Sequence, residues 1–220
     1  MMMIRWIAGI CAALVLAGCS NQTQPNPTAG GAFVSGIGRI LSRTTAKPAA
    51  KPVFTRAQFA GVTEPAVLVT LEDVDAVASI IRIANNQGAE TYQGVDAIAL
   101  TLQGGVLIAT RGYSDDLMQS DMSGLQSALK RGQGTYDKSM SYLTGQNRFR
   151  TLAFRCELRA AGRERIVILG KAHQTRRLQE TCVTGTRQID NTYWMEGPRM
   201  VRSRQWVADG ISRMMIEQIQ

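Results

Sequence analysis

The stretch Ile98-Ala-Leu-Thr-Leu-Gln-Gly-Gly-Val-Leu-Ile-Ala-Thr-Arg111 indicates the fold most clearly. Two runs rich in apolar residues, 98–102 and 106–111, flank the segment Gln103-Gly104-Gly105. A short glycine-containing link between two such runs predicts a β-hairpin. Polar and apolar residues alternate within the first run, which is typical of an antiparallel sheet with one face toward water.

Similar β-like runs continue along the chain on both sides of this hairpin. Strands that recur roughly every ten residues with glycine turns between them predict an antiparallel β-sandwich or a barrel-like body. The expected fold class is therefore mainly β, with two or three short helices. The predicted strands cover residues 66–71, 78–84, 90–93, 98–102, 106–111, 136–143, 148–159, 165–169, 175–181, 187–196, 200–207 and 211–219.

Three segments have helical patterns. Thr55 and Gln58 have the spacing of a capping box, which predicts a short helix there. A second helix is expected after Asp121, which can cap its start, and before Gly132, which suits its end. Apolar residues at helical spacing predict a third helix at residues 33–41.

The N-terminus has the pattern of a bacterial lipoprotein signal. Arg5 gives a small positive region, and residues 7–17 form an apolar segment too short to span a bilayer. Leu16-Ala17-Gly18-Cys19 then matches a lipobox, in which cleavage leaves an acylated Cys19 as the first residue. Two or more acyl chains, such as palmitate, hold a protein stably on a membrane. The alternative is an ordinary signal peptide followed by an unrelated cysteine.

This signal sets the expected domains and location. Residues 1–18 form the signal peptide, 19–53 a lipidated N-terminus with a flexible tether and short helix, and 54–220 a single β-rich periplasmic domain. The tether is expected because residues 20–31 are polar and rich in Pro and Gly. Ser20 stands where an Asp would favour retention at the inner membrane, so we expect an outer-membrane lipoprotein facing the periplasm.

The composition limits the partners. Lys+Arg 25 against Asp+Glu 17 gives a net charge of +8, which favours anionic partners. Nucleic acid is not expected, because the periplasm holds none, and this leaves lipid phosphate, an acidic glycan or an acidic protein surface. A single His excludes a multi-His metal centre, and no Walker motif or CxxC knuckle is present. We therefore expect no metal and no cofactor.

The four cysteines support the same compartment. Cys11 would leave with the signal and Cys19 would carry lipid, so Cys156 and Cys182 remain as a pair in an oxidising space. A disulfide between them is expected to stabilise the fold by roughly 3 kcal/mol. The alternative is two unpaired buried thiols.

Candidate catalytic residues are few. Asp115, Asp116 and Asp121 could be paired carboxylates or a calcium loop, but a capped turn with the acids at its positive end is the favoured interpretation. His173 could act as a general base toward a nucleophile such as Ser139. A lone His in a polar stretch is more often a surface residue, and no enzymatic activity is predicted.

Arginine is concentrated in the last third of the chain. In Arg202-Ser203-Arg204-Gln205-Trp206, strand alternation would place Arg202, Arg204 and Trp206 on one face. Guanidinium groups grip carboxylates and phosphates, and a Trp ring stacks on sugars. The three residues are therefore a candidate glycan- or partner-binding face. A solvated outer face with Trp206 partly in the core would explain the pattern equally well.

Five segments, taken together in their order and spacing, resemble a known family. They are Leu16-Ala-Gly-Cys19, Leu102-Gln-Gly-Gly-Val-Leu-Ile-Ala-Thr-Arg-Gly112 continuing into Asp115-Asp-Leu-Met118, Glu180-Thr-Cys182, Tyr193-Trp194 and Ser203-Arg-Gln-Trp206. The pattern resembles the YjbF/GfcB family of bacterial lipoproteins, which are encoded with exopolysaccharide and group 4 capsule export genes.

This resemblance implies an outer-membrane lipoprotein with a mostly β body that assists secretion of an extracellular or capsular polysaccharide without catalysis. It also implies two partners, a large outer-membrane β-barrel export protein and a periplasmic companion, besides membrane lipid bound through Cys19. Two alternatives stay open. One is a periplasmic glycan-modifying hydrolase using Asp115, Asp116 or His173, and the other is an envelope lipoprotein that binds anionic lipid through its arginines.

Overall fold

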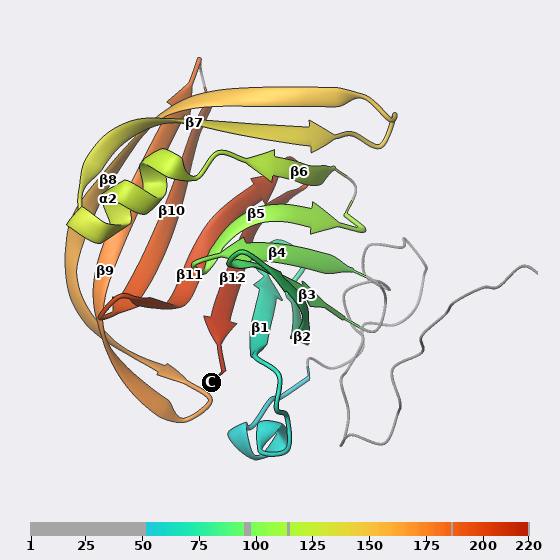
Figure 1. The fold of residues 1–220 in the computed structure, drawn as a ribbon, viewed down its shortest axis with the longest axis vertical. Helices are drawn as coiled ribbons and strands as arrows, with labels where there is room; N and C mark the ends of the chain where they lie inside the picture. Colours follow the sequence, from blue (N-terminus) through green and yellow to red (C-terminus); the bar gives the residue numbers. More distant parts are fainter. Residues whose placement is uncertain (1–51, 95–97, 114, 186, 220) are drawn as a thin grey trace, which may run out of the picture.

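The computed structural model describes residues 52–94, 98–113, 115–185 and 187–219, and the fold is mainly β. The strands form one antiparallel sheet in the order β5-β4-β3-β2-β1-β12-β11-β10-β9-β8-β7-β6. The sheet curls until its two edges approach each other, giving a nearly closed, barrel-like body (Figure 1). The predicted fold class is therefore confirmed.

The order of the strands follows the chain except at one place. Consecutive strands pair with each other except β5 and β6, which are the two edges of the sheet. β1 and β12 pair in the middle of the sheet and so join the two ends of the described chain. The bounds are η1 Arg56–Phe59, β1 Ala66–Leu71, β2 Ala76–Asn86, β3 Ala89–Gln93, β4 Ala99–Gln103, β5 Val106–Arg111, β6 Asp116–Ser120, α2 Ser123–Arg131, β7 Gly134–Leu143, β8 Phe149–Ile168, β9 Lys171–Thr184, β10 Arg187–Glu196, β11 Arg199–Ala208 and β12 Ile211–Gln218.

Side chains, rather than a backbone ladder, join the two edge strands β5 and β6. The backbone N–H of Leu117 donates to Oγ1 of Thr110 at 2.8 Å, and Nη1 of Arg111 donates to the carbonyl oxygen of Leu117 at 3.3 Å. The Asp116 carboxylate accepts the backbone N–H groups of Gly112 and Tyr113 at 3.2 and 3.0 Å. These bonds satisfy polar groups that an open sheet edge would leave unpaired.

Three of the predicted strand ranges coincide with strands of the structure, most of the others differ by a few residues at an end, and two differences concern whole strands. The predicted ranges 66–71, 106–111 and 187–196 are those of β1, β5 and β10. By contrast, β8 is one long strand where two were expected. The expected break is a register shift between Ala160 and Arg163, and Gly162, with φ 91°, takes the backbone conformation there that other residues avoid. The five-residue strand β6 was not predicted.

Strand alternation fills the interior of the barrel-like sheet. On β7, Tyr136, Lys138, Met140 and Tyr142 are buried, while residues between them are exposed or half-buried. β8 shows the same alternation around Cys156, and β9 shows it around Glu180. The buried apolar side chains of the sheet form one continuous core.

A second, smaller packing layer lies on the other side of the sheet. Tyr193 and Met200 belong to the interior core, so their neighbours Trp194 and Val201 face outward by alternation. The end of the β8–β9 hairpin covers these two residues with Ile166 and Ile168. Next to it, η1 packs Phe59 against β1 and β12, and Arg56 donates from Nη1 to the carbonyl oxygen of Ile219 at 2.7 Å.

The helices are short. The capping box predicted for Thr55 and Gln58 is present, but η1 is a single turn of 3-10 helix. In α2 the side chains of Leu125, Ala128 and Leu129 are buried. Gly132 ends the helix in the left-handed conformation at φ 82°. Its N-cap is Met122 rather than Asp121, whose Oδ1 accepts the Ser123 N–H at 3.0 Å. The helix predicted at 33–41 lies outside the described residues.

In the described ranges, no helix combines the length and the apolar character needed to cross a membrane.

Candidate functional site

The two arginines of the candidate binding face lie side by side on β11 and are each engaged by a carboxylate. Nε of Arg202 donates to Oε1 of Glu217 at 2.7 Å, and its guanidinium stacks over the Trp194 ring, 5.6 Å from the centroid. Arg204 grips both oxygens of Glu72, with Nε to Oε1 at 2.6 Å. Both guanidiniums are half-buried, and this face is a cross-strand ion-pair network.

Trp206 does not share the exposure of the two arginines. Its side chain is 9% exposed and packs edge-on against Tyr142 and Phe154, with ring centroids 6.0 and 6.3 Å apart. The β10–β11 ladder ends at the pair Thr192–Arg204, and the Trp206 backbone N–H donates instead to Oδ1 of Asn191 at 2.6 Å. The two arginines therefore share a face, while Trp206 packs into the core, as the alternative interpretation of the sequence expected.

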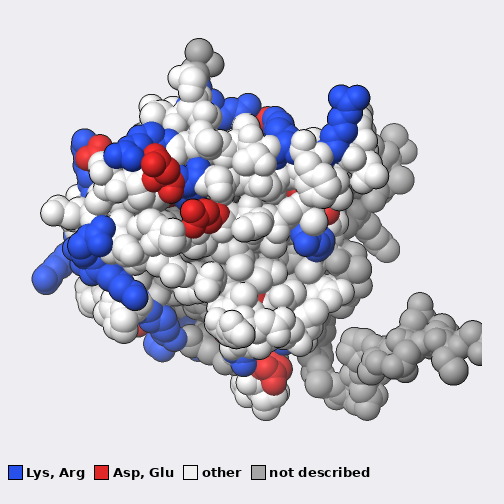
Figure 2. Space-filling model, turned by 45° about the horizontal axis from the view of Figure 1, so that its top comes forward, with Lys and Arg blue, Asp and Glu red and all other residues white. Residues whose placement is uncertain are grey.

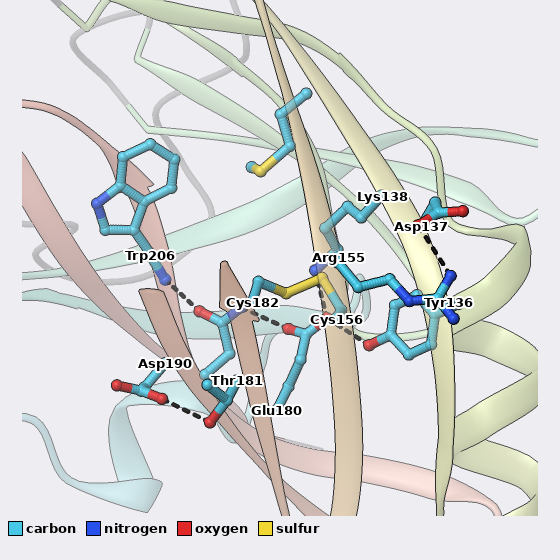
Figure 3. The surroundings of a disulfide bond; sticks show 12 residues. Tyr136, Asp137, Lys138, Arg155, Cys156, Glu180, Thr181, Cys182, Asp190 and Trp206 are labelled. Carbon is cyan, nitrogen blue, oxygen red and sulfur yellow. Dashed lines mark hydrogen bonds and ion pairs between the residues drawn. A yellow bond between two sulfur atoms is a disulfide. The ribbon is translucent and has the colours of Figure 1, made fainter. Parts of the chain in front are cut away.

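The expected disulfide is present between the two longest strands. Cys156 on β8 and Cys182 on β9 are direct partners in the antiparallel register, and their sulfurs are bonded (Figure 3). Both cysteines are buried within the interior core. The bond thus joins two strands that backbone hydrogen bonds already pair.

A cluster of buried polar groups surrounds Glu180, which lies two residues before Cys182 on β9. Its carboxylate is fully buried and accepts Nζ of Lys138 at 2.6 Å and the Tyr193 hydroxyl at 2.7 Å. The Tyr136 hydroxyl and Nδ2 of Asn191 also donate to it. These donors come from β7 and β10, on either side of the β8–β9 hairpin, so the cluster joins strands across the interior. Figure 3 shows Glu180 with the two β7 donors, Tyr136 and Lys138.

The electrostatics of this cluster favour an ionised Glu180. Burial alone raises the pKa of this carboxyl, but Lys138 and the hydrogen bonds from Tyr136 and Asn191 outweigh burial and hold the pKa below its ordinary value. Burial, with the charge of Glu180, raises the pKa of Tyr193 far above its ordinary value. The cluster is therefore a satisfied buried ion pair, in which every donor serves one carboxylate.

The residues weighed for catalysis are dispersed over the structure. Asp115 pairs with Arg150 at 3.5 Å. Asp116 accepts backbone N–H groups between the edge strands β5 and β6. The expectation of a surface location for His173 is wrong, since its side chain is 2% exposed. The β8–β9 hairpin end buries it, with Nδ1 3.1 Å from the Glu196 carboxylate. Ser139, its suggested nucleophile, is exposed on β7.

One predicted site residue lies outside the described part of the chain, and one buried residue was not predicted. Cys19, the predicted lipidation site, lies outside the described residues. A buried role for Glu180 was not predicted, although this residue alternates with Leu178 and Cys182 along β9. That alternation was the available signal for a buried carboxylate. Its sulfur neighbours are joined in a disulfide, so they are not thiolate ligands for a metal.

The fold and the site together describe one kind of protein. It is a nearly closed antiparallel β body, braced by a disulfide and a buried ion pair, with arginines engaged on its outer face. The chain belongs to the YjbF family, described as group 4 capsule polysaccharide lipoprotein gfcB, YjbF, whose model matches residues 32–219.

A solved structure supports the fold independently. The chain is similar to the crystal structure of the hypothetical lipoprotein YmcC from Escherichia coli (K12), at 18% sequence identity and a TM-score of 0.67. The match covers 76% of this chain and 88% of that one. No curated protein matches the chain.

Proposed function

We propose that this protein is a lipid-anchored accessory of extracellular or capsular polysaccharide secretion, held at the outer membrane with its β body in the periplasm. The observation that carries the proposal is the family match over residues 32–219, because the family is described as a capsule polysaccharide lipoprotein. The family thus links the chain to an envelope polysaccharide, and the accessory role in export is our inference from that link.

The physical basis of the role is confinement. Acyl chains on Cys19 would hold the body within a thin layer at the membrane, with residues 20–31 as a tether. Confinement raises the effective concentration of the body near a membrane-embedded partner. The partners we expect are an outer-membrane β-barrel export protein and a periplasmic companion, with an acidic polysaccharide as a further ligand.

Two features of the described chain support an envelope location and a non-catalytic role. The Cys156–Cys182 disulfide is of the kind that persists in oxidising compartments such as the periplasm. Asp115 and Asp116 are engaged by Arg150 and by backbone N–H groups, and His173 is buried beside Glu196. A hydrolase built on these residues would need them to meet at a substrate, so we do not favour that alternative.

The experiment that tests the proposal is deletion of the gene with restoration on a plasmid. We expect surface polysaccharide to fall while the pools of sugar nucleotides stay unchanged, because only export would be affected. Restoration by the wild-type chain and by the Asp115→Asn variant is expected, since that side chain has no part in the proposed role. Unchanged surface polysaccharide after deletion would refute the proposal, and failure of D115N at normal protein levels would favour the hydrolase.

A further inference from the structure

An open cleft of about 600 Å³ lies along the β8–β9 hairpin. It borders two irregularities of the sheet, the register shift at Ala160/Arg163 on β8 and the shift at Trp194/Met195 on β10. Bulges often re-aim side chains toward a ligand. The residues that line the cleft are Arg163, Gln174, Thr175, Arg176, Met195 and Gly197.

Two arginines of the cleft lining lie side by side on neighbouring strands. Arg163 and Arg176 are direct cross-strand partners in the β8–β9 ladder. Like charges in directly opposed positions destabilise a sheet. Within the described ranges, no carboxylate forms an ion pair with either guanidinium, so no acidic side chain compensates this repulsion.

The adjacent carboxylates are already engaged elsewhere. Glu164, next to Arg163 in sequence, accepts the indole N–H of Trp194 at 3.0 Å and pairs with Arg177 at 3.3 Å. Glu196, next to the lining residue Met195, is bound by His173 and lies 3.6 Å from Arg199. An anion that entered the cleft would therefore meet two arginines with spare N–H donors and no competing internal carboxylate.

Helix α2 holds one of these guanidiniums in place. Nη2 of Arg176 donates to the carbonyl oxygen of Leu129 at 3.3 Å, near the C-terminus of α2 where carbonyl groups favour a cation. Gly132 leaves room for it, because a Cβ there would lie 2.8 Å from Nη1 of Arg176. A guanidinium fixed before binding loses less entropy when a ligand arrives. A group of Lys and Arg side chains lies at the left of Figure 2, the side where Figure 1 shows α2, β8 and β9.

We infer that this cleft binds a carboxylate-bearing sugar residue of an acidic glycan. The inference rests on the proposed function, and it names the chemical group that the protein recognises. Arginine forks bind carboxylates in bidentate fashion. Gln174 offers an amide for sugar hydroxyls, Met195 gives an apolar wall, and the volume is within the roughly 300–1,000 Å³ range of small-ligand sites.

The test is direct binding of a fluorescently labelled oligogalacturonate to the full-length chain in non-ionic detergent. We expect saturable binding that a neutral maltooligosaccharide of equal length does not compete. Arg163→Gln and Arg176→Gln are each expected to weaken binding about tenfold or more, as loss of a charged hydrogen bond does. Arg148→Gln is the matched control, because it removes one exposed arginine in the turn between β7 and β8.

Three results would overturn the inference. They are the lack of saturable binding, equal competition by the neutral oligosaccharide, and an equal loss of affinity in R148Q and R163Q. Arg176 also donates to α2, so R176Q could lose binding through unfolding. If R176Q is less stable than the wild-type chain, the binding affinity of R163Q alone decides the test. Vesicles with and without phosphatidylglycerol separate the sources of the anion. If R163Q loses vesicle binding while the wild-type chain ignores oligogalacturonate, the site serves lipid and the glycan inference is wrong.

The binding experiment and the gene deletion can fail independently of each other. If gene deletion removes surface polysaccharide but the chain binds no oligogalacturonate, the secretion role stands and the cleft loses its assignment. If deletion has no effect and the oligogalacturonate still binds through Arg163, the cleft stands and the secretion role fails.

Discussion

Glu180 is a fully buried carboxylate that is paired with Lys138. A fully buried carboxylate is costly unless it is paired and hydrogen-bonded, and here Lys138 and three neutral donors surround it. Sequence alone could have flagged Glu180 by its place between two buried residues of β9. It could not have named Lys138 or Asn191 as partners, because their meeting depends on how three strands curve around one interior.

Removal of Lys138 should therefore destabilise the fold strongly. Lys138→Met leaves the Glu180 charge buried without its cation, which typically costs about 3–5 kcal/mol. Urea unfolding followed by tryptophan fluorescence measures the loss as a lower midpoint. Lys130→Met is the matched control, because Lys130 is exposed near the end of α2 and its removal should cost less than about 1 kcal/mol. Equal midpoints for the two variants would contradict the role given to the ion pair.

At the scale of elements, the sequence predicts strands well where alternation is clean and glycine turns are close. The bounds of β5 and β10, which glycines flank, were predicted for this reason, whereas β1 was predicted from its branched apolar residues after Pro65. β6 was overlooked because its acidic start resembles a turn, and its strand character comes from the β5–β6 seam and from pairing with β7. The single long β8 and the burial of His173 have one common cause, a hairpin that passes through a bulge and folds its end over the sheet.

The disulfide fixes the middle of this long hairpin. It closes a segment with a sequence separation of 26, for which the chain-entropy model gives roughly 3 kcal/mol. The double variant Cys156→Ser with Cys182→Ser should lower the urea midpoint by the corresponding amount. Dithiothreitol should lower the wild-type midpoint equally and leave the double variant unchanged. A wild-type midpoint that does not respond to full reduction would show that the bond adds no stability.

At the scale of the whole molecule, the curled sheet brings strands from both ends of the described chain into its middle and seals its edges with side chains. Local patterns predicted antiparallel pairing of neighbouring strands, but not the β1–β12 pair, which depends on residues far apart in sequence. The sequence left two placements of Trp206 open, beside the arginines or partly in the core, and the fold was needed to decide between them. The candidate cleft also depends on the fold, since its arginines meet only across the β8–β9 ladder.

The envelope role depends on one claim, that Cys19 is acylated and fastens this body to a membrane. The most direct test is mass spectrometry of the N-terminal peptide of the mature protein purified from the membrane fraction. We predict a chain that begins at Cys19, with diacylglycerol on its sulfur and an acyl chain on its nitrogen. A mature chain with an unmodified Cys19, recovered in the soluble fraction, would contradict the account.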